Sequence, residues 1–192
     1  RYYQTAGVAP AFPFGFGLSY TSFAYSDLKA TSDSVTLTVT NTGSCDGAEI
    51  GQIYVAKPDA KVFRPVQELK GFEKVKLAAG ESKCVAIPLD DKAFRYWNTM
   101  TNAWEMEGGH YEIRVGASCE DIRLTATVEV AGTGAPNPYA GISLPHYESG
   151  KVMNVPDAEW EVLLDRPIPD DTVKIDCNMT LGELKHSRSP LC

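Results

Sequence analysis

The chain has 192 residues, of which 43% are apolar and 22% are charged, and its formal net charge is −7. This balance is typical of a globular protein, and no apolar run approaches the roughly 20 residues that a membrane-spanning helix needs. Acidic and basic residues are interspersed and leave no concentrated basic face. We therefore expect neither nucleic acid nor a membrane as a partner.

An unusual alternation, FPFGFGLSYT, lies near the start of the chain. Large apolar residues occupy every even position, namely Phe12, Phe14, Phe16, Leu18 and Tyr20, and the intervening positions include Gly15 and Gly17. A period of two predicts a strand-like ribbon with one bulky face and one bare face. Because a bare face lets another backbone approach closely, we interpret residues 1–22 as a linking ribbon that straps this module to a preceding domain. An ordinary edge strand is the alternative.

Short alternating runs separated by turn residues fill residues 23–130. They occur at residues 35–40, 50–57, 68–77, 83–89, 103–107, 110–117 and 122–130. About seven strands without helical periodicity between them predict an all-β fold, an antiparallel two-sheet sandwich. We expect its inner faces to combine Val35, Leu37, Val39, Ile53, Val55, Phe72, Val85, Ile87, Leu89, Tyr111, Ile113, Val115, Leu124, Ala126 and Val128.

The loop of residues 57–67 (the basic loop) is long and bounded by proline, so it is a candidate to reach a neighbouring domain or a substrate rim. The candidate contact residues are Lys61, Phe63, Arg64 and Glu68. We expect Glu68 to pair with Arg64 or Lys70 rather than to act in catalysis.

The stretch FRYWNTMTNAWEM predicts a hairpin whose loop spans residues 98–102. This hairpin would bring Trp97 and Trp104 together across paired strands. We expect the pair to be buried in the sandwich or its rim, since cross-strand aromatic pairs are common in cores. The alternative is an exposed platform that binds sugar.

No pattern in the chain indicates a catalytic or metal site. The neighbours Asp90 and Asp91 point to opposite sides of an extended chain, and Asp170 and Asp171 sit in a Pro-bounded loop, so we interpret all four as solvated turn residues. The three histidines are far apart in sequence and have no Cys or carboxylate at ligand spacing. We expect no metal ion and no organic cofactor.

Five cysteines are widely spaced and odd in number, at Cys45, Cys84, Cys119, Cys177 and Cys192. They lack the C-x-x-C spacing of a zinc or redox motif, so we interpret them as reduced thiols, three in the core region and two in the tail. Unpaired thiols favour a cytoplasmic location.

The amino-acid composition changes after residue 130, where AGTGAPNPYAGISLP is rich in Gly and Pro and cannot continue a central strand. We interpret residues 131–192 as an irregular extension with short helical turns. One is predicted at residues 158–164, and a capping box formed by Thr180 and Glu183 predicts another. Such short pieces cannot form a core of their own, so the extension should lie across another surface.

Three stretches, FPFGFGLSYTSFAYS, RPVQELKGFEKV and WEMEGGHYEIRVGASCEDIRL, resemble the C-terminal fibronectin type III-like module of glycoside hydrolase family 3. The resemblance covers about residues 1–130 and implies a fibronectin type III-like sandwich. It also implies that the catalytic aspartate and glutamate lie in other domains, a barrel and an α/β sandwich, so no catalytic role passes to this chain. The parent enzyme would cleave terminal β-linked sugars with retention.

These observations favour a non-catalytic accessory module of a β-glycosidase of the β-glucosidase type. Its partners would be the two catalytic domains, and it could lend the basic loop to the active-site rim. One alternative is an independent carbohydrate-binding module that uses Trp97 and Trp104 to hold an oligosaccharide. Another is an adhesive or oligomerising sandwich of the immunoglobulin kind.

Overall fold

The computed structural model describes residues 2–169, 177, 178, 180 and 182 of the chain. It divides into two compact units, Arg1–Lys151 and Val152–Cys192. Within the described part, no helix has the length and apolar character needed to cross a membrane. The predicted capping box cannot be followed, because Glu183 lies outside the described residues.

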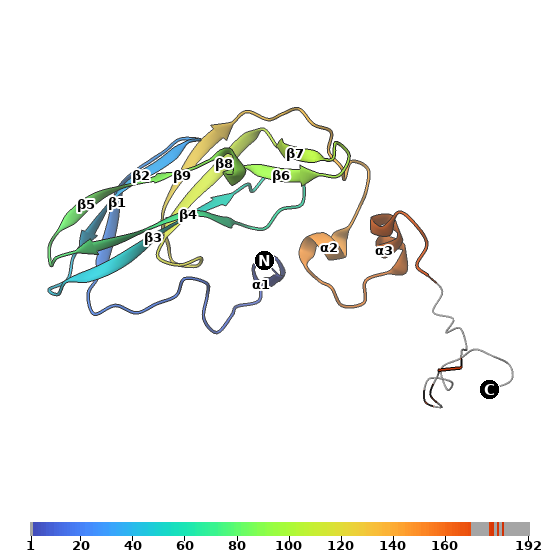
Figure 1. Cartoon of the computed structure of the whole chain (residues 1–192), viewed down its shortest axis with the longest axis horizontal. Helices are drawn as coiled ribbons and strands as arrows, with labels where there is room; N and C mark the ends of the chain where they lie inside the picture. The colour runs from blue at the N-terminus through green and yellow to red at the C-terminus, as the bar shows by residue number, and fades with distance from the viewer. Residues whose placement is uncertain (1, 170–176, 179, 181, 183–192) are drawn as a thin grey trace. The chain divides into compact units, whose positions relative to one another are not determined.

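Two antiparallel sheets form the sandwich of the first unit (Figure 1). One has the order β1-β2-β5, with β1 at Phe23–Ala30, β2 at Ser34–Asn41 and β5 at Ser82–Pro88. The other has the order β4-β3-β8-β9, with β3 at Gly47–Ala56, β4 at Glu68–Leu77, β8 at Gly109–Gly116 and β9 at Ile122–Val130. The predicted sandwich is confirmed, and β1 is a strand that was not predicted as a separate run.

The core lies between the two sheets and follows from side-chain alternation. In β2, Val35, Leu37 and Val39 are buried while the threonines between them are only half-buried. The rings of Phe94 and Tyr111 meet edge to face in this core, with 5.1 Å between their centroids. Each such ring buries a large apolar area and so contributes strongly to the stability of a small sandwich.

The prediction that Phe72 belongs to the core is wrong, because this residue is 64% exposed. The pleat of β4 turns Val75 and Leu77 inward, so the strict period of two turns Phe72 outward. The inward position next to it is taken by Gly71, which faces Ile53 across the ladder. A side chain at residue 71 would meet Ile87 of the other sheet, so the sheets approach closely at this glycine.

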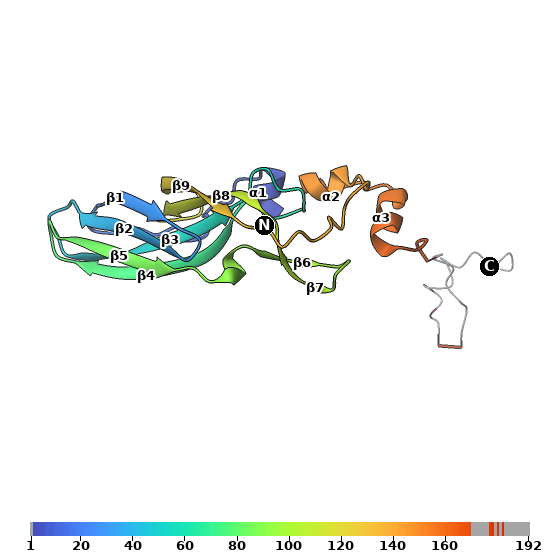
Figure 2. The ribbon, with the colours of Figure 1, turned by 90° about the horizontal axis from the view of Figure 1, so that it is seen from above.

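A separate two-stranded hairpin, β6 (Arg95–Asn98) and β7 (Ala103–Met106), follows the 3-10 turn at Asp91–Ala93. It lies at one end of the sandwich, the end where α1 (Tyr2–Ala6) also lies (Figures 1 and 2). The helix α2 (Pro145–Ser149) contacts α1 and ends at Gly150, which adopts a left-handed conformation with φ 69°.

The described part of the second unit contains α3, at Asp157–Leu164, which confirms the helix predicted there. The helix follows Pro156 and ends at Asp165 in a left-handed conformation. Its apolar side chains, including Trp160 and Val162, are exposed.

Four cysteines, Cys45, Cys84, Cys119 and Cys177, are free thiols, as predicted. Their assignment to the core is wrong for Cys45 and Cys84, which are exposed. In β5 the period of two gives the inward positions to Val85 and Ile87 and turns Cys84 outward. Cys192 lies outside the described residues.

Candidate functional site

The aromatic segment (residues 12–20) is not the strand-like ribbon that its alternation predicts. It is irregular, with a turn in which the Phe16 amide donates to the Pro13 carbonyl at 3.0 Å. Gly15 has φ +84°, a backbone conformation that residues with a side chain rarely adopt. This conformation interrupts an extended chain. A period of two produces a strand only where a partner strand supplies hydrogen bonds, and the described chain offers none here.

The aromatic segment is nevertheless held in place by contacts at both of its ends. The Cys119 amide donates to the Phe14 carbonyl at 2.9 Å. Gly15 lies so close to the Gln52 side chain that a Cβ atom at residue 15 would come within 2.5 Å of it. Just after the segment, the Thr21 hydroxyl donates to the side-chain oxygen of the buried Asn41 at 2.6 Å. The segment therefore has a defined path across the sandwich.

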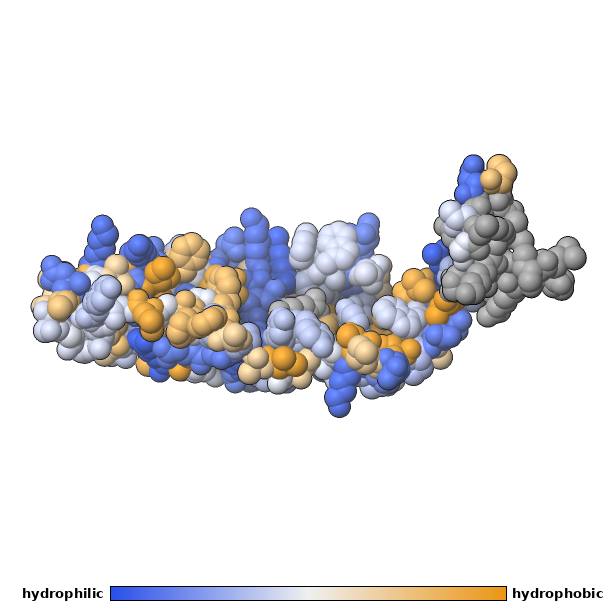
Figure 3. Space-filling model, turned by 90° about the horizontal axis from the view of Figure 1, so that it is seen from below, coloured by the Kyte–Doolittle hydropathy of each residue, from blue (hydrophilic) through white to orange (hydrophobic). Residues whose placement is uncertain are grey.

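The large side chains of this segment point into solvent, and those of Leu18 and Tyr20 are almost completely exposed. Figure 3 shows apolar side chains gathered on the side of the sandwich where this segment runs in Figure 1. The segment and the outer face of β3 and β4 enclose a groove of about 740 Å³. Its apolar lining includes Phe14, Phe16, Ile50 and Phe72. A segment that is held in place and still exposes such side chains is suited to docking against another protein surface.

The prediction that the tryptophan pair is buried is wrong. Trp97 and Trp104 do face each other across β6 and β7, and their rings meet edge to face with centroids 5.5 Å apart. Their side chains are 46% and 60% exposed, respectively. The opposite face of the hairpin, which carries Tyr96 and Asn98, packs against the domain instead.

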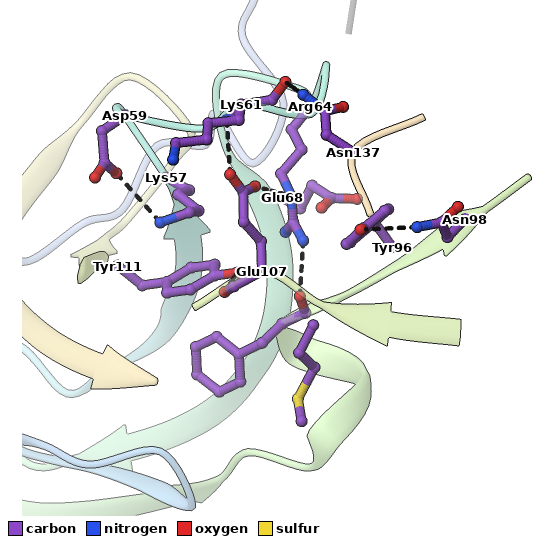
Figure 4. Close-up of polar contacts among 12 residues, drawn as sticks. Lys57, Asp59, Lys61, Arg64, Glu68, Tyr96, Asn98, Glu107, Tyr111 and Asn137 are labelled. Carbon is purple, nitrogen blue, oxygen red and sulfur yellow. Dashed lines mark hydrogen bonds and ion pairs between the residues drawn. The ribbon is translucent and has the colours of Figure 1, made fainter. Parts of the chain in front are cut away.

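The basic loop is tied to the hairpin by a polar cluster around Arg64 and Glu107 (Figure 4). The guanidinium of Arg64 donates to the Phe94 carbonyl at 2.9 Å and lies 3.8 Å from the Glu107 carboxylate. That carboxylate accepts from the Lys61 amide at 2.7 Å, and the Tyr111 hydroxyl donates to the Glu107 carbonyl. The side chains of Arg64 and Glu107 are only 9% and 13% exposed.

Most of the predicted contact residues of the basic loop already have partners within the domain. Arg64 is occupied inside the domain, and Glu68 pairs with Lys70 at 3.6 Å, as predicted. Phe63 is half-buried and packs against Tyr147, with ring centroids 4.6 Å apart and the ring planes tilted by 51°. Of the four predicted contact residues, Lys61 is exposed and the other three are half-buried.

Burial raises the pKa of the Tyr111 hydroxyl to about 12, although the nearby Arg64 cation partly opposes the rise. Burial likewise raises the pKa of Tyr54 to about 12. Both hydroxyls therefore stay protonated over the ordinary pH range and act as hydrogen-bond donors, Tyr54 to the Gln52 side chain and Tyr111 to Glu107.

The structure gives the neighbouring aspartates structural roles. Asp90 caps the 3-10 turn by accepting from the Lys92 amide at 3.0 Å, and Asp91 forms an ion pair with Arg95. Asp170 and Asp171 lie outside the described residues. Within the described ranges, no group of three His, Cys, Asp or Glu side chains is placed to hold a metal ion.

Three residues were not predicted from the sequence as functional. They are Glu107, Gln52 and Asn98, which hold the basic loop, the aromatic segment and the hairpin in place, respectively. Glu107 and Asn98 stand in polar, turn-rich stretches where solvent exposure is the default expectation, so local pattern carried no signal for them.

Comparisons with known proteins cover most of the first unit. Residues 49–119 match the family model described as a fibronectin type III-like domain. The exo-alpha-(1->6)-L-arabinopyranosidase of Bifidobacterium longum is 49% identical over 143 residues, which are 72% of this chain and 19% of that protein. The thermostable beta-glucosidase B of Acetivibrio thermocellus is 48% identical over 141 residues, 69% of this chain and 19% of that protein.

The crystal structure of a GH3 beta-glucosidase from Bifidobacterium adolescentis superposes with a TM-score of 0.66 at 41% identity. The match covers 83% of this chain and 23% of that one. The chain thus spans about a fifth of the length of the curated relatives that it matches.

Proposed function

Because the chain belongs to the fibronectin type III-like domains of glycoside hydrolase family 3, we propose that it braces the catalytic domains of a larger β-glycosidase without performing catalysis itself. The observation that carries this proposal is the aromatic segment, which is held in place on the sandwich and yet exposes its large side chains. In this proposal a barrel domain and an α/β domain are the partners that cover it.

The size of the exposed patch supports a protein partner. An aromatic side chain can bury about 150–250 Å², so the four aromatic rings and the leucine of the segment present on the order of 700 Å². The largest apolar patch on a monomer is typically about 300–600 Å², and one side of a standard protein interface buries about 800 Å². Phe72 and Ile50 extend the patch across the groove.

The proposed reaction of the parent enzyme is inferred from the names of the relatives. They include several beta-glucosidases and an exo-alpha-(1->6)-L-arabinopyranosidase, so the parent would release a terminal sugar from an oligosaccharide, most simply as a β-glucosidase. Retention requires two carboxyl groups about 5–5.5 Å apart, which the partner domains would supply without metal or organic cofactor. Lys61 is exposed on the basic loop, and in this proposal its side chain is the one that reaches the active-site rim.

The free-standing alternatives have less support. An independent carbohydrate-binding module would leave the aromatic segment permanently in water, where its exposed rings invite aggregation. An adhesive or oligomerising sandwich would cover the segment, but the relatives that match the chain are named as glycosidases.

Association of the chain with its parent's catalytic part tests the proposal. The two pieces are produced separately and titrated by calorimetry, and hydrolysis of an aryl β-glucoside is assayed for each piece. We expect equimolar binding with a Kd of about 1 µM or tighter, which corresponds to about 8 kcal/mol, and no turnover by the chain alone. An absence of binding at about 100 µM would contradict the proposal.

A further inference from the structure

We propose that the exposed pair Trp97 and Trp104 forms a binding site for a β-linked oligosaccharide, within the same enzyme that the domain braces. This role goes beyond bracing, because it gives the domain a direct contact with the sugar. The ligand class is a chain of pyranose rings, bound through stacking on indole and through hydrogen bonds to the ring hydroxyls.

The geometry of the pair leaves aromatic surface available to a ligand. Edge-to-face packing at 77° uses the edge of one indole and one face of the other, so further ring surface remains open to solvent. The exposed fractions of 46% and 60% agree with this. One face of a β-linked pyranose carries C–H groups with slight positive charge, which complement the negative face of an aromatic ring.

Polar groups for sugar hydroxyls lie beside the indoles. Arg95 stands two residues before Trp97 in β6, and the period of two places it on the same face of the hairpin. Its guanidinium pairs with the Asp91 carboxylate, so this edge offers both donors and acceptors. Each indole also has an N–H donor.

The hairpin is held as a rigid support. The fully buried Asn98 accepts from the Met100 amide at 2.9 Å and donates to the Pro136 carbonyl at 2.8 Å. On the same side, the Arg64 guanidinium lies 5.3 Å from the Tyr96 ring. A preorganised platform binds a ligand without first losing side-chain freedom, which favours affinity.

The size of the platform favours a sugar over a protein. About half of each indole is exposed, so the pair presents on the order of 250 Å². This is well below the 800 Å² or so that one partner contributes to a stable protein interface, and it suits one or two pyranose rings.

Tryptophan fluorescence during sugar titration tests this assignment. The full chain is titrated with cellotetraose and xylotetraose as β-linked probes and with maltotetraose as an α-linked control. The chain has three tryptophans, so a Trp160→Phe background confines the emission to the hairpin. We expect a saturable shift with a Kd of about 1 mM or tighter for at least one β-linked probe, and weaker binding of maltotetraose.

Variants of the hairpin separate sugar binding from folding. Trp97→Ala and Trp104→Ala should each weaken binding at least about tenfold with little change in melting temperature, because both side chains are about half exposed. Trp97→Tyr should retain part of the affinity.

The proposal is overturned by the absence of a saturable shift at about 10 mM probe, or by equal binding of the α-linked control. It is also overturned if Trp97→Ala abolishes association with the catalytic part, since the pair would then belong to the protein interface. Sugar binding can fail while that association persists, so the two proposals fail separately.

Discussion

Replacing Phe14, Phe16 and Leu18 together by serine is expected to lower the affinity of the chain for its parent's catalytic part by at least about 100-fold. These side chains lie in the proposed interface, and anchors at the centre of an interface each contribute about 2 kcal/mol or more. A 100-fold loss needs only about 2.7 kcal/mol in total. Calorimetric titration of the variant against the catalytic part measures the change.

The same variant should unfold at the temperature of the wild-type chain, because the three side chains are exposed and contribute little to its own core. Met100→Ser provides a matched control, since Met100 is also apolar and 64% exposed but lies on the hairpin loop. It should bind the catalytic part as the wild type does. Equal loss of affinity in both variants, or unchanged affinity in the triple variant, would remove the aromatic segment from the interface.

Glu107→Ala is expected to lower the free energy of unfolding by about 3 kcal/mol and the melting temperature by about 6–12 °C. The substitution leaves the nearly buried Arg64 guanidinium without its carboxylate and the Lys61 amide without its acceptor. Removing one member of a buried ion pair destabilises a protein more than removing both, because an uncompensated charge remains. Chemical denaturation of the chain gives the value.

Two further variants show whether burial is the cause. Glu129→Ala removes an exposed carboxylate that pairs with His110, and it should cost less than about 1 kcal/mol. The double variant Arg64→Met/Glu107→Leu should be more stable than Glu107→Ala, since it leaves no unpaired charge. If Glu107→Ala costs no more than Glu129→Ala, the cluster does not hold the basic loop in the way described.

The sandwich could be predicted from the sequence because apolar and polar residues alternate along its strands. The bounds of β4 and β9 match the predicted runs at residues 68–77 and 122–130, since one face of each strand must reach the core. The assignment of Phe72 to the core is wrong because the alternation set by Val75 and Leu77 turns this residue outward despite its hydrophobicity.

The surfaces could not be predicted in the same way. The alternation around Gly15 suggested a strand, but strand formation needs a partner, and sequence does not say whether one is present. The pairing of Trp97 with Trp104 follows from the hairpin. The hairpin turns this pair to solvent because Asn98 is buried and Tyr96 half-buried on its other face. The Arg64–Glu107 pair joins residues 43 positions apart, beyond any local pattern.

Chemical labelling at residue 18 shows whether the aromatic segment is covered in the complete enzyme. Leu18→Cys places a thiol at a side chain that is 92% exposed in this chain, and the exposed Cys84 on the other sheet serves as an internal control. Both positions are mapped by mass spectrometry after maleimide treatment of the isolated chain and of the complete parent enzyme. We expect residue 18 to react in the isolated chain and to be protected in the complete enzyme, while Cys84 reacts in both forms. Equal reactivity of residue 18 in both forms would contradict it.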